Sequence, residues 1–368
     1  MVVAMNISEL ETPAVIVDVD IMQRNLERAA QYANQHGLRL RPHTKTHKSP
    51  AIARMQLQLG AAGLTVAKVG EAEVMIKAEP KDLLVAYPVI GRSKLARLME
   101  VARSTRVSVA LDSVFAARQL SDAAREAQVV VGVLVEFDAG LHRVGVTTNE
   151  ELLQLARSVE KLPRLTLDGI AFYPGHIKSL DDGGQEAFDE VSAILQSVLE
   201  DFKRAGIEVQ VVSGGSTPLL FHSHKMEGLT EIRPGTYVYN DLNTQRCGAC
   251  SLDDCAAWVL ATVISTARKG YMIIDGGSKT FSSDRLAGTS EVSYGRFEEA
   301  PEAILYNMNE EHGYVDIRKT DREFTVGDRV RVIPNHVCTL MNMHDSVYGI
   351  RGDQVVTEWR VEARGKLR

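Results

Sequence analysis

A regular alternation of strand-like and helix-like segments over the first two thirds of the chain constrains the fold most. Short runs rich in β-branched residues recur at Leu38–Pro42, Gly63–Val66, Leu83–Tyr87, Val107–Leu111, Val129–Phe137, Leu167–Phe172, Val209–Val212 and Leu229–Ile232. Segments with the apolar spacing of a helix separate most of them. Eight such units predict a closed (β/α)8 barrel, and the count of eight favours it over an open, doubly wound sheet.

The pattern changes after about Gln245, where strand-like runs follow one another without a long helix. These runs are Ala257–Ala267, Tyr271–Ile274, Val292–Gly295, Gly327–Ile333, Ser346–Ile350 and Gln354–Ala363. They predict a second, mostly β domain. The early strand Ala14–Val19 is a candidate to join it, so we expect a barrel over residues 20–244 and a β domain from residues 1–19 plus 245–368.

Composition excludes several classes of protein. A formal net charge of -6 gives no reason to expect nucleic-acid binding. A mean hydropathy of -0.10 and the lack of an apolar run of about 18 residues argue against a membrane span. Residues Met1–Pro13 lack the pattern of a secretory signal. Four cysteines do not make a disulfide framework, so we expect a cytoplasmic protein.

Polar residues gather where the predicted barrel strands end, which is where (β/α)8 barrels hold their active sites. In chain order these are Lys45, Lys68, Tyr87, Asp112, Asp138 with His142 and Arg143, Tyr173 with His176, Ser213–Thr217, and Arg233–Tyr237. The last two groups carry glycines and hydrogen-bond donors after strands seven and eight, which is a common phosphate site.

A lysine at the first strand end and a phosphate cradle at the last two together indicate pyridoxal phosphate. Arg143 is a candidate partner for its phenolic oxygen and Tyr173 for its ring nitrogen. The alternatives at these positions are a solvated basic turn for Lys45, a loop salt bridge for Arg143 and a packed aromatic ring for Tyr173.

A second constellation is His336-Val337-Cys338, which we expect on a strand, where residues i and i+2 share a face. Imidazole and thiolate together favour zinc over magnesium or calcium. Two protein ligands would leave coordination positions for water or substrate. His344 and Asp345 are near enough to be further ligands or supporting groups, and a buried pair in a β core is the alternative.

Two other motifs are weaker. Cys247-Gly248-Ala249-Cys250 with Cys255 has zinc-like spacing but lacks a second pair of ligands, so thiols at the domain junction are expected. Asp275–Lys279 is expected to form a tight turn.

The residues Arg41–Lys48, Arg233–Tyr237, Asp275–Lys279 and His336–Cys338 resemble the D-threonine aldolase and D-serine dehydratase family. These are pyridoxal phosphate enzymes distantly similar to alanine racemase. The resemblance implies an alanine racemase-type barrel, a β domain and a homodimer.

The resemblance also implies a role for each motif residue. Lys45 would form the Schiff base with the cofactor. Arg143 and Tyr173 would face the cofactor ring, and the phosphate would be held by Gly215, Ser216, Thr217, Gly235 and Thr236. His336 and Cys338 would bind a divalent metal, with zinc expected and manganese or magnesium as alternatives. His176 is the candidate second base.

The resulting expectation is a lyase acting on D-configured 3-hydroxy amino acids. Retro-aldol cleavage to glycine and an aldehyde is the first reading. The alternative is a D-serine or 3-hydroxy-D-aspartate dehydratase that releases a 2-keto acid and ammonia. Within the family that the chain resembles, dehydratases carry His-x-Cys at this pair, as here, and aldolases carry His-x-Asp, whereas Leu340–Asp345 is more similar to aldolases. An amino-acid racemase and a non-catalytic cofactor-binding protein are further alternatives.

Overall fold

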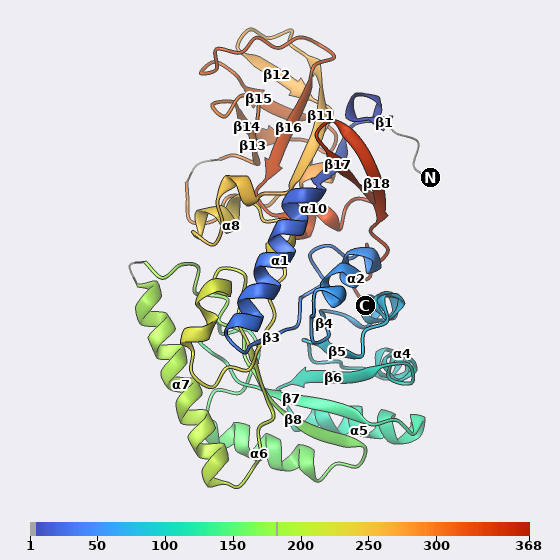
Figure 1. The fold of residues 1–368 in the computed structure, drawn as a ribbon, viewed down its shortest axis with the longest axis vertical. Coiled ribbons are helices and arrows are strands. Elements are labelled where there is room, and N and C mark those ends of the chain that lie inside the picture. The colour runs from blue at the N-terminus through green and yellow to red at the C-terminus, as the bar shows by residue number, and fades with distance from the viewer. Residues whose placement is uncertain (1–4, 182, 291) are drawn as a thin grey trace. The chain divides into compact units, whose positions relative to one another are not determined.

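The computed structural model describes residues 5–181, 183–290 and 292–368, and the chain forms two compact units (Figure 1). The first unit contains Met1–Leu26, Thr46–Ser49 and Thr236–Gly365, and the second contains Glu27–Lys45, Pro50–Gly235 and Lys366–Arg368. Residues 1–4, which belong to the predicted β-domain segment 1–19, lie outside the described ranges. The chain therefore crosses between the units several times, once directly after Lys45.

The second unit is built on a parallel sheet of eight strands within the described residues. The strands are β3 (Arg39–Leu40), β4 (Leu64–Val66), β5 (Asp82–Val85), β6 (Arg106–Leu111), β7 (Val131–Glu136), β8 (Leu165–Ala171), β9 (Val211–Gly214) and β10 (Glu231–Ile232). Their order is β3-β10-β9-β8-β7-β6-β5-β4. The edge strands meet, because His43 forms a parallel bridge with Thr65 and Ala62 N donates to Leu40 O at 2.8 Å. The predicted (β/α)8 barrel is confirmed.

Helices follow the barrel strands in the predicted alternation (Figure 1). They are α2 (Pro50–Gln58), α3 (Val69–Met75), α4 (Arg92–Ala102), α5 (Val114–Ala127), α6 (Asn149–Glu160) and α7 (Gly184–Arg204), after α1 (Val19–Gln35). A 3-10 helix, Leu220–Lys225, follows β9. Among the described residues, no helix has both the length and the apolar content that a membrane crossing requires.

A network of buried charges lies among the barrel strands. Arg41 lies 2.8 Å from Glu231 and 3.0 Å from Asp82, and the side chains of Arg41 and Glu231 are almost wholly buried. Arg106 extends the network by contacting both Asp82 at 2.9 Å and Asp168 at 2.8 Å. Burial alone would raise the pKa of Asp82, but the two guanidinium groups outweigh burial and lower it. The network ties together strands that are far apart in the sequence.

The first unit contains a sheet of ten strands within the described chain. They are β1 (Met5–Asn6), β2 (Ala14–Asp18), β11 (Ala257–Ser265), β12 (Tyr271–Ile274), β13 (Gly295–Phe297), β14 (Ile304–Met308), β15 (Gly313–Asp316), β16 (Arg329–Pro334), β17 (Ser346–Arg351) and β18 (Gln354–Arg360). Their order is β1-β18-β17-β2-β11-β12-β15-β14-β13-β16, and β11 also pairs with β16. Six of these strands therefore close on themselves, and β2 pairs with β11 and β17 in the same sheet.

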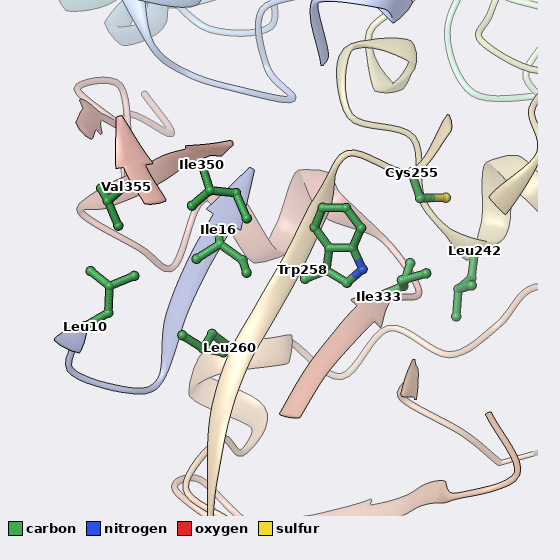
Figure 2. Packing of buried hydrophobic residues seen from close by; sticks show 9 residues of the cluster. All are labelled: Leu10, Ile16, Leu242, Cys255, Trp258, Leu260, Ile333, Ile350 and Val355. Atoms are coloured by element: carbon green, nitrogen blue, oxygen red, sulfur yellow. The ribbon is translucent and has the colours of Figure 1, made fainter. Parts of the chain in front are cut away.

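The β sheet is held by a cluster of buried apolar side chains that Figure 2 shows around Trp258. The cluster consists of Leu10, Ile16, Leu242, Cys255, Trp258, Leu260, Ile333, Ile350 and Val355. Its members come from both ends of the chain, which explains why the N-terminal strand belongs to this unit and not to the barrel.

Three details of the β domain differ from the sequence prediction. Strands β14 and β15 were not predicted, because they are short and only partly buried. The turn expected at Asp275–Lys279 continues into a short helix, α9 (Ser278–Phe281). The strand expected to carry both His336 and Cys338 ends at Pro334, and a short helix, α10 (Val337–Met341), follows it.

Replacing Arg41 with methionine should destabilise the protein by about 3–5 kcal/mol, because it leaves the buried Glu231 carboxylate without its closest cation. The midpoint of urea unfolding measures this. Arg125→Met is the matched control, because Arg125 pairs with Asp122 on an exposed face of α5 and should change stability by less than about 0.5 kcal/mol. Equal midpoints for the two variants would contradict a structural role for the network.

Candidate active site

Lys45 lies in the turn that follows β3 and the His43–Thr65 bridge. Its neighbour Thr44 is fixed, because the Thr44 backbone N–H donates to Thr65 O at 2.8 Å. Lys45 is half-buried, and within the described ranges its ammonium has no hydrogen bond or ion pair. An amine that extends from a fixed backbone and has no carboxylate partner is available to react with a carbonyl group.

Two loops at neighbouring strand ends make the candidate phosphate cradle. Strands β9 and β10 are paired in parallel, so the loops that follow them emerge side by side. Gly215 has a φ of +82°, a left-handed conformation that suits glycine. Gly235 N donates to Thr217 Oγ1 at 3.2 Å, and Leu219 N donates to Ser216 Oγ at 3.4 Å. The small residues, hydroxyl groups and backbone amides that a phosphate requires are therefore gathered at this position.

Arg143 and Tyr173 lie together, with the guanidinium carbon 4.8 Å from the ring centroid. The loop that carries Arg143 is held by Asp138, whose carboxylate accepts the backbone N–H groups of Gly140 and His142, each at 3.0 Å. Burial alone would raise the pKa of Asp138, but these hydrogen bonds outweigh it and lower the pKa. Arg143 and Tyr173 are thus brought to one place, as a shared ligand requires.

His176 packs against the same loop. A Cβ added at Gly140, whose φ is +100°, would lie 3.1 Å from His176 Cε1, so the His176 ring packs closely against the Gly140 backbone. The Nδ1 atom of His176 is buried, and none of the described residues forms a hydrogen bond with it. A buried imidazole nitrogen without a partner can accept a proton from a ligand.

A buried carboxyl group that the sequence did not indicate lies at the end of β7. Burial raises the pKa of Glu136, and the nearby positive charges of Arg233 and Arg143 counteract part of that rise. Arg233 is fixed by hydrogen bonds to Ser213 Oγ at 2.6 Å and to Phe172 O at 2.9 Å. The Glu136 carboxyl group therefore lies near two guanidinium groups, one of them on Arg143 in the segment after β7.

His336 and Cys338 are close together, although by a different geometry from the one expected. His336 is the extended N-cap residue of α10, and Cys338 lies in the first turn of that helix. Burial alone would lower the pKa of His336, but the negative charge of Cys338 and the hydrogen bond with Asp241 raise it to about 11. The pair is joined by a turn from strand to helix rather than by one strand face.

Asp241 is the supporting residue that sequence reasoning missed. Its carboxylate lies 3.0 Å from His336 Nδ1, and it also accepts the Val337 N–H at 3.1 Å and caps α8 (Leu242–Arg246) through Thr244 N at 2.7 Å. The helix-capping pattern Asp-x-x-Thr was the available signal. Because Nδ1 faces Asp241, the Nε2 atom of His336 is the one left for a metal.

Cys338 contacts two threonines that follow other candidate residues in the sequence. Thr46 Oγ1, next to Lys45 in the chain, lies 3.2 Å from Cys338 Sγ. Thr236 Oγ1, next to Gly235, lies 3.9 Å from the same atom. The candidate metal ligand Cys338 therefore contacts the residues that directly follow Lys45 and Gly235 in the chain.

The remaining metal candidates are engaged elsewhere. His344 Nε2 lies 3.1 Å from Thr280 O, and Asp345 pairs with Arg364 at 2.7 Å. No group of three or more His, Cys, Asp or Glu side chains in the described part of the chain is arranged to hold a metal. His336 and Cys338 would accordingly need water or substrate to complete a coordination sphere.

The four cysteines, all within the described ranges, form no disulfide. A hydrogen bond with Cys255 and burial both raise the pKa of Cys250. Cys250 and Cys255 are therefore neighbouring thiols, rather than parts of a zinc site with Cys247.

Comparisons with known proteins give a consistent picture. Residues 17–243 match the N-terminal domain of alanine racemase, and residues 256–350 match a serine dehydratase domain. The 3-hydroxy-D-aspartate aldolase of Paracoccus denitrificans (strain Pd 1222) is 32% identical over 98% of this chain and 94% of its own length.

Two solved structures extend the comparison. The D-threonine aldolase from Filomicrobium marinum has a TM-score of 0.93 at 29% identity and covers all of both chains. The D-threo-3-hydroxyaspartate dehydratase from Delftia sp. HT23 has a TM-score of 0.88 at 32% identity, covering 96% of this chain and 98% of its own. The dehydratase is also solved as two mutants, in which a histidine and a cysteine two positions later are each replaced by alanine, the cysteine mutant in a metal-free form.

Proposed function

This chain belongs to the alanine racemase-like family whose relatives include D-threonine aldolase and D-serine dehydratase, and we propose that it is a pyridoxal phosphate- and metal-dependent lyase. Its proposed substrates are D-configured 3-hydroxy amino acids, and its proposed reaction is retro-aldol cleavage to glycine and an aldehyde. The observation that carries the proposal is Lys45, a half-buried amine without a charged partner in the described chain, at the strand end beside the two candidate phosphate loops.

The residues at these strand ends provide the groups that pyridoxal phosphate needs: an amine, hydrogen-bond donors for the phosphate and contacts for the ring. Lys45 would hold the cofactor's carbonyl carbon, and Gly215, Ser216, Thr217, Gly235 and Thr236 would hold its phosphate. Arg143 would face the phenolic oxygen and Tyr173 the ring. When bound, the cofactor supplies an electron sink for the electron pair left on the substrate's α-carbon.

Different side chains would accept the proton of the substrate's 3-hydroxyl and bind the metal. His176 would accept the proton of the substrate's 3-hydroxyl through its buried, unpartnered Nδ1. His336 and Cys338 would hold a divalent metal, with zinc favoured by the imidazole and thiolate donors. A metal at this pair would lower the pKa of a hydroxyl that binds it.

A dehydratase is the second candidate function, and one specific observation favours it. His336 and Cys338 have the same spacing as the histidine and cysteine that were mutated in the dehydratase relative. In this version Lys45 would remove the α-proton, the 3-hydroxyl would leave as water, and hydrolysis would release a 2-keto acid and ammonia.

We also propose that the protein acts as a homodimer, as the family resemblance implies. Three large apolar side chains, Tyr87, Ile90 and Phe115, are 39–63% exposed on the segments that follow β5 and β6. Their exposure supports a partner surface at this end of the barrel.

The protein loaded with pyridoxal phosphate and zinc should convert D-threonine to glycine and acetaldehyde, measured by amino-acid analysis and by alcohol dehydrogenase-coupled detection of the aldehyde. Ammonia and 2-oxobutanoate would instead establish the dehydratase. Racemisation of D-alanine, with neither pair of products formed, would contradict both lyase proposals.

Asp241→Asn should weaken zinc binding by about 10–100-fold, because the carboxylate that orients His336 is lost. Calorimetric titration of chelator-treated protein measures the affinity. Thr244→Ala is the matched control, because it removes another contact of Asp241 but leaves the carboxylate on His336. Unchanged zinc affinity in Asp241→Asn would refute the orienting role of Asp241.

Cys338→Ala should lose zinc while retaining the absorbance of the bound cofactor, because Cys338 is a proposed metal ligand and not a cofactor contact.

A further inference from the structure

Lys68 lies at the C-terminal end of β4, directly above a neighbouring aromatic ring. Its Nζ atom is 3.5 Å from the centroid of the Tyr87 ring. Val66 pairs with Val85, so Lys68 and Tyr87 each come two residues beyond a paired position and lie at the same level of the barrel. Lys68 is half-buried and serves as the N-cap residue of α3 without a side-chain capping bond.

Lys68, unlike two arginines of the barrel, has no carboxylate partner among the described residues. Arg41 and Arg106 both contact Asp82. Lys68 forms no hydrogen bond or ion pair with any residue in the described ranges. A cation–π contact satisfies the ammonium only in part, and its N–H donors remain available for an anion.

Lys45 and Lys68 leave the barrel at the same edge, on neighbouring strands. His43 is bridged in parallel to Thr65, and Lys45 and Lys68 follow the two bridged residues by two and three positions. The candidate cofactor contacts of the barrel come from the ends of β3 and β7–β10. The sector formed by β4 and β5 carries none of them, and it borders the reactive amine on the side away from the phosphate loops.

We propose that Lys68 binds a carboxylate of the substrate and so positions the amino acid beside Lys45. The inference rests on the proposed lyase function and deepens it. An ammonium is a compact point charge that suits a carboxylate, and the Tyr87 ring holds it in place. The carboxylate is either the α-carboxylate that every amino acid has or the side-chain carboxylate of a 3-hydroxyaspartate. Lys68 is thus a positioning and specificity residue.

The test compares Lys68→Met with Lys81→Met in the cofactor- and zinc-loaded enzyme. Methionine keeps an unbranched apolar stem but removes the charge, and Lys81 is an exposed lysine just before β5. The KM and kcat are measured for D-threonine and D-threo-3-hydroxyaspartate. Binding of D-alanine and D-aspartate, which lack a 3-hydroxyl, is measured by titrating the cofactor absorbance.

Lys68→Met should weaken binding by about tenfold or more, the loss expected for one charge-assisted hydrogen bond, with unchanged cofactor content. An equal loss for all four compounds assigns the α-carboxylate, and a loss confined to the two dicarboxylates assigns the side-chain carboxylate. Lys68→Arg should recover part of the affinity, which excludes misfolding as the cause.

Affinities within twofold of the Lys81→Met control for all four compounds would overturn the inference. The absorbance titrations distinguish this failure from a failure of the proposed function. An enzyme that cleaves neither hydroxy amino acid still reports, through D-alanine and D-aspartate, whether Lys68 binds a carboxylate.

Discussion

The site depends on the buried ion pair between Arg41 and Glu231. Arg41 directly follows β3 and Glu231 lies in β10. Their side chains are 2.8 Å apart and almost wholly buried. Asp82 on β5 pairs with the same guanidinium. A buried charge without its partner is strongly unfavourable, so the arrangement that satisfies all three groups is favoured over others. Lys45 follows Arg41 by four residues, and the same constraint therefore fixes where the Lys45 side chain emerges from the barrel.

Parallel strand order explains how distant residues reach one edge. The lysine turn, the Arg143 loop, Tyr173 and the two glycine-bearing loops each follow a different strand, and all strands of the sheet point the same way. Loops at such an edge are free to vary in chemistry while the strands keep their spacing. The barrel thus fixes the positions of these segments, and the segments carry the candidate amine, cation, imidazole and hydrogen-bond donors of the proposed site.

The barrel and its strand-end residues could be predicted from the sequence, because burial on both faces and helical spacing leave a periodic signal. Local geometry at the metal pair could not be predicted, since His336 and Cys338 are joined by a strand-to-helix turn rather than one strand face. Asp241 was missed because it lies 95 residues from His336 in the chain, and only folding brings them together. The roles assigned to the site residues remain predictions that rest on the family resemblance and on chemistry.

The attachment point of the cofactor tests the central claim most directly. Protein reconstituted with pyridoxal phosphate is reduced with borohydride, digested and examined by peptide mass spectrometry. The account predicts that the reduced cofactor is attached to Lys45, and that Lys45→Ala carries none. Attachment at Lys48 or Lys68 in the wild-type protein, or a Lys45→Ala variant that still carries the reduced cofactor, would contradict it.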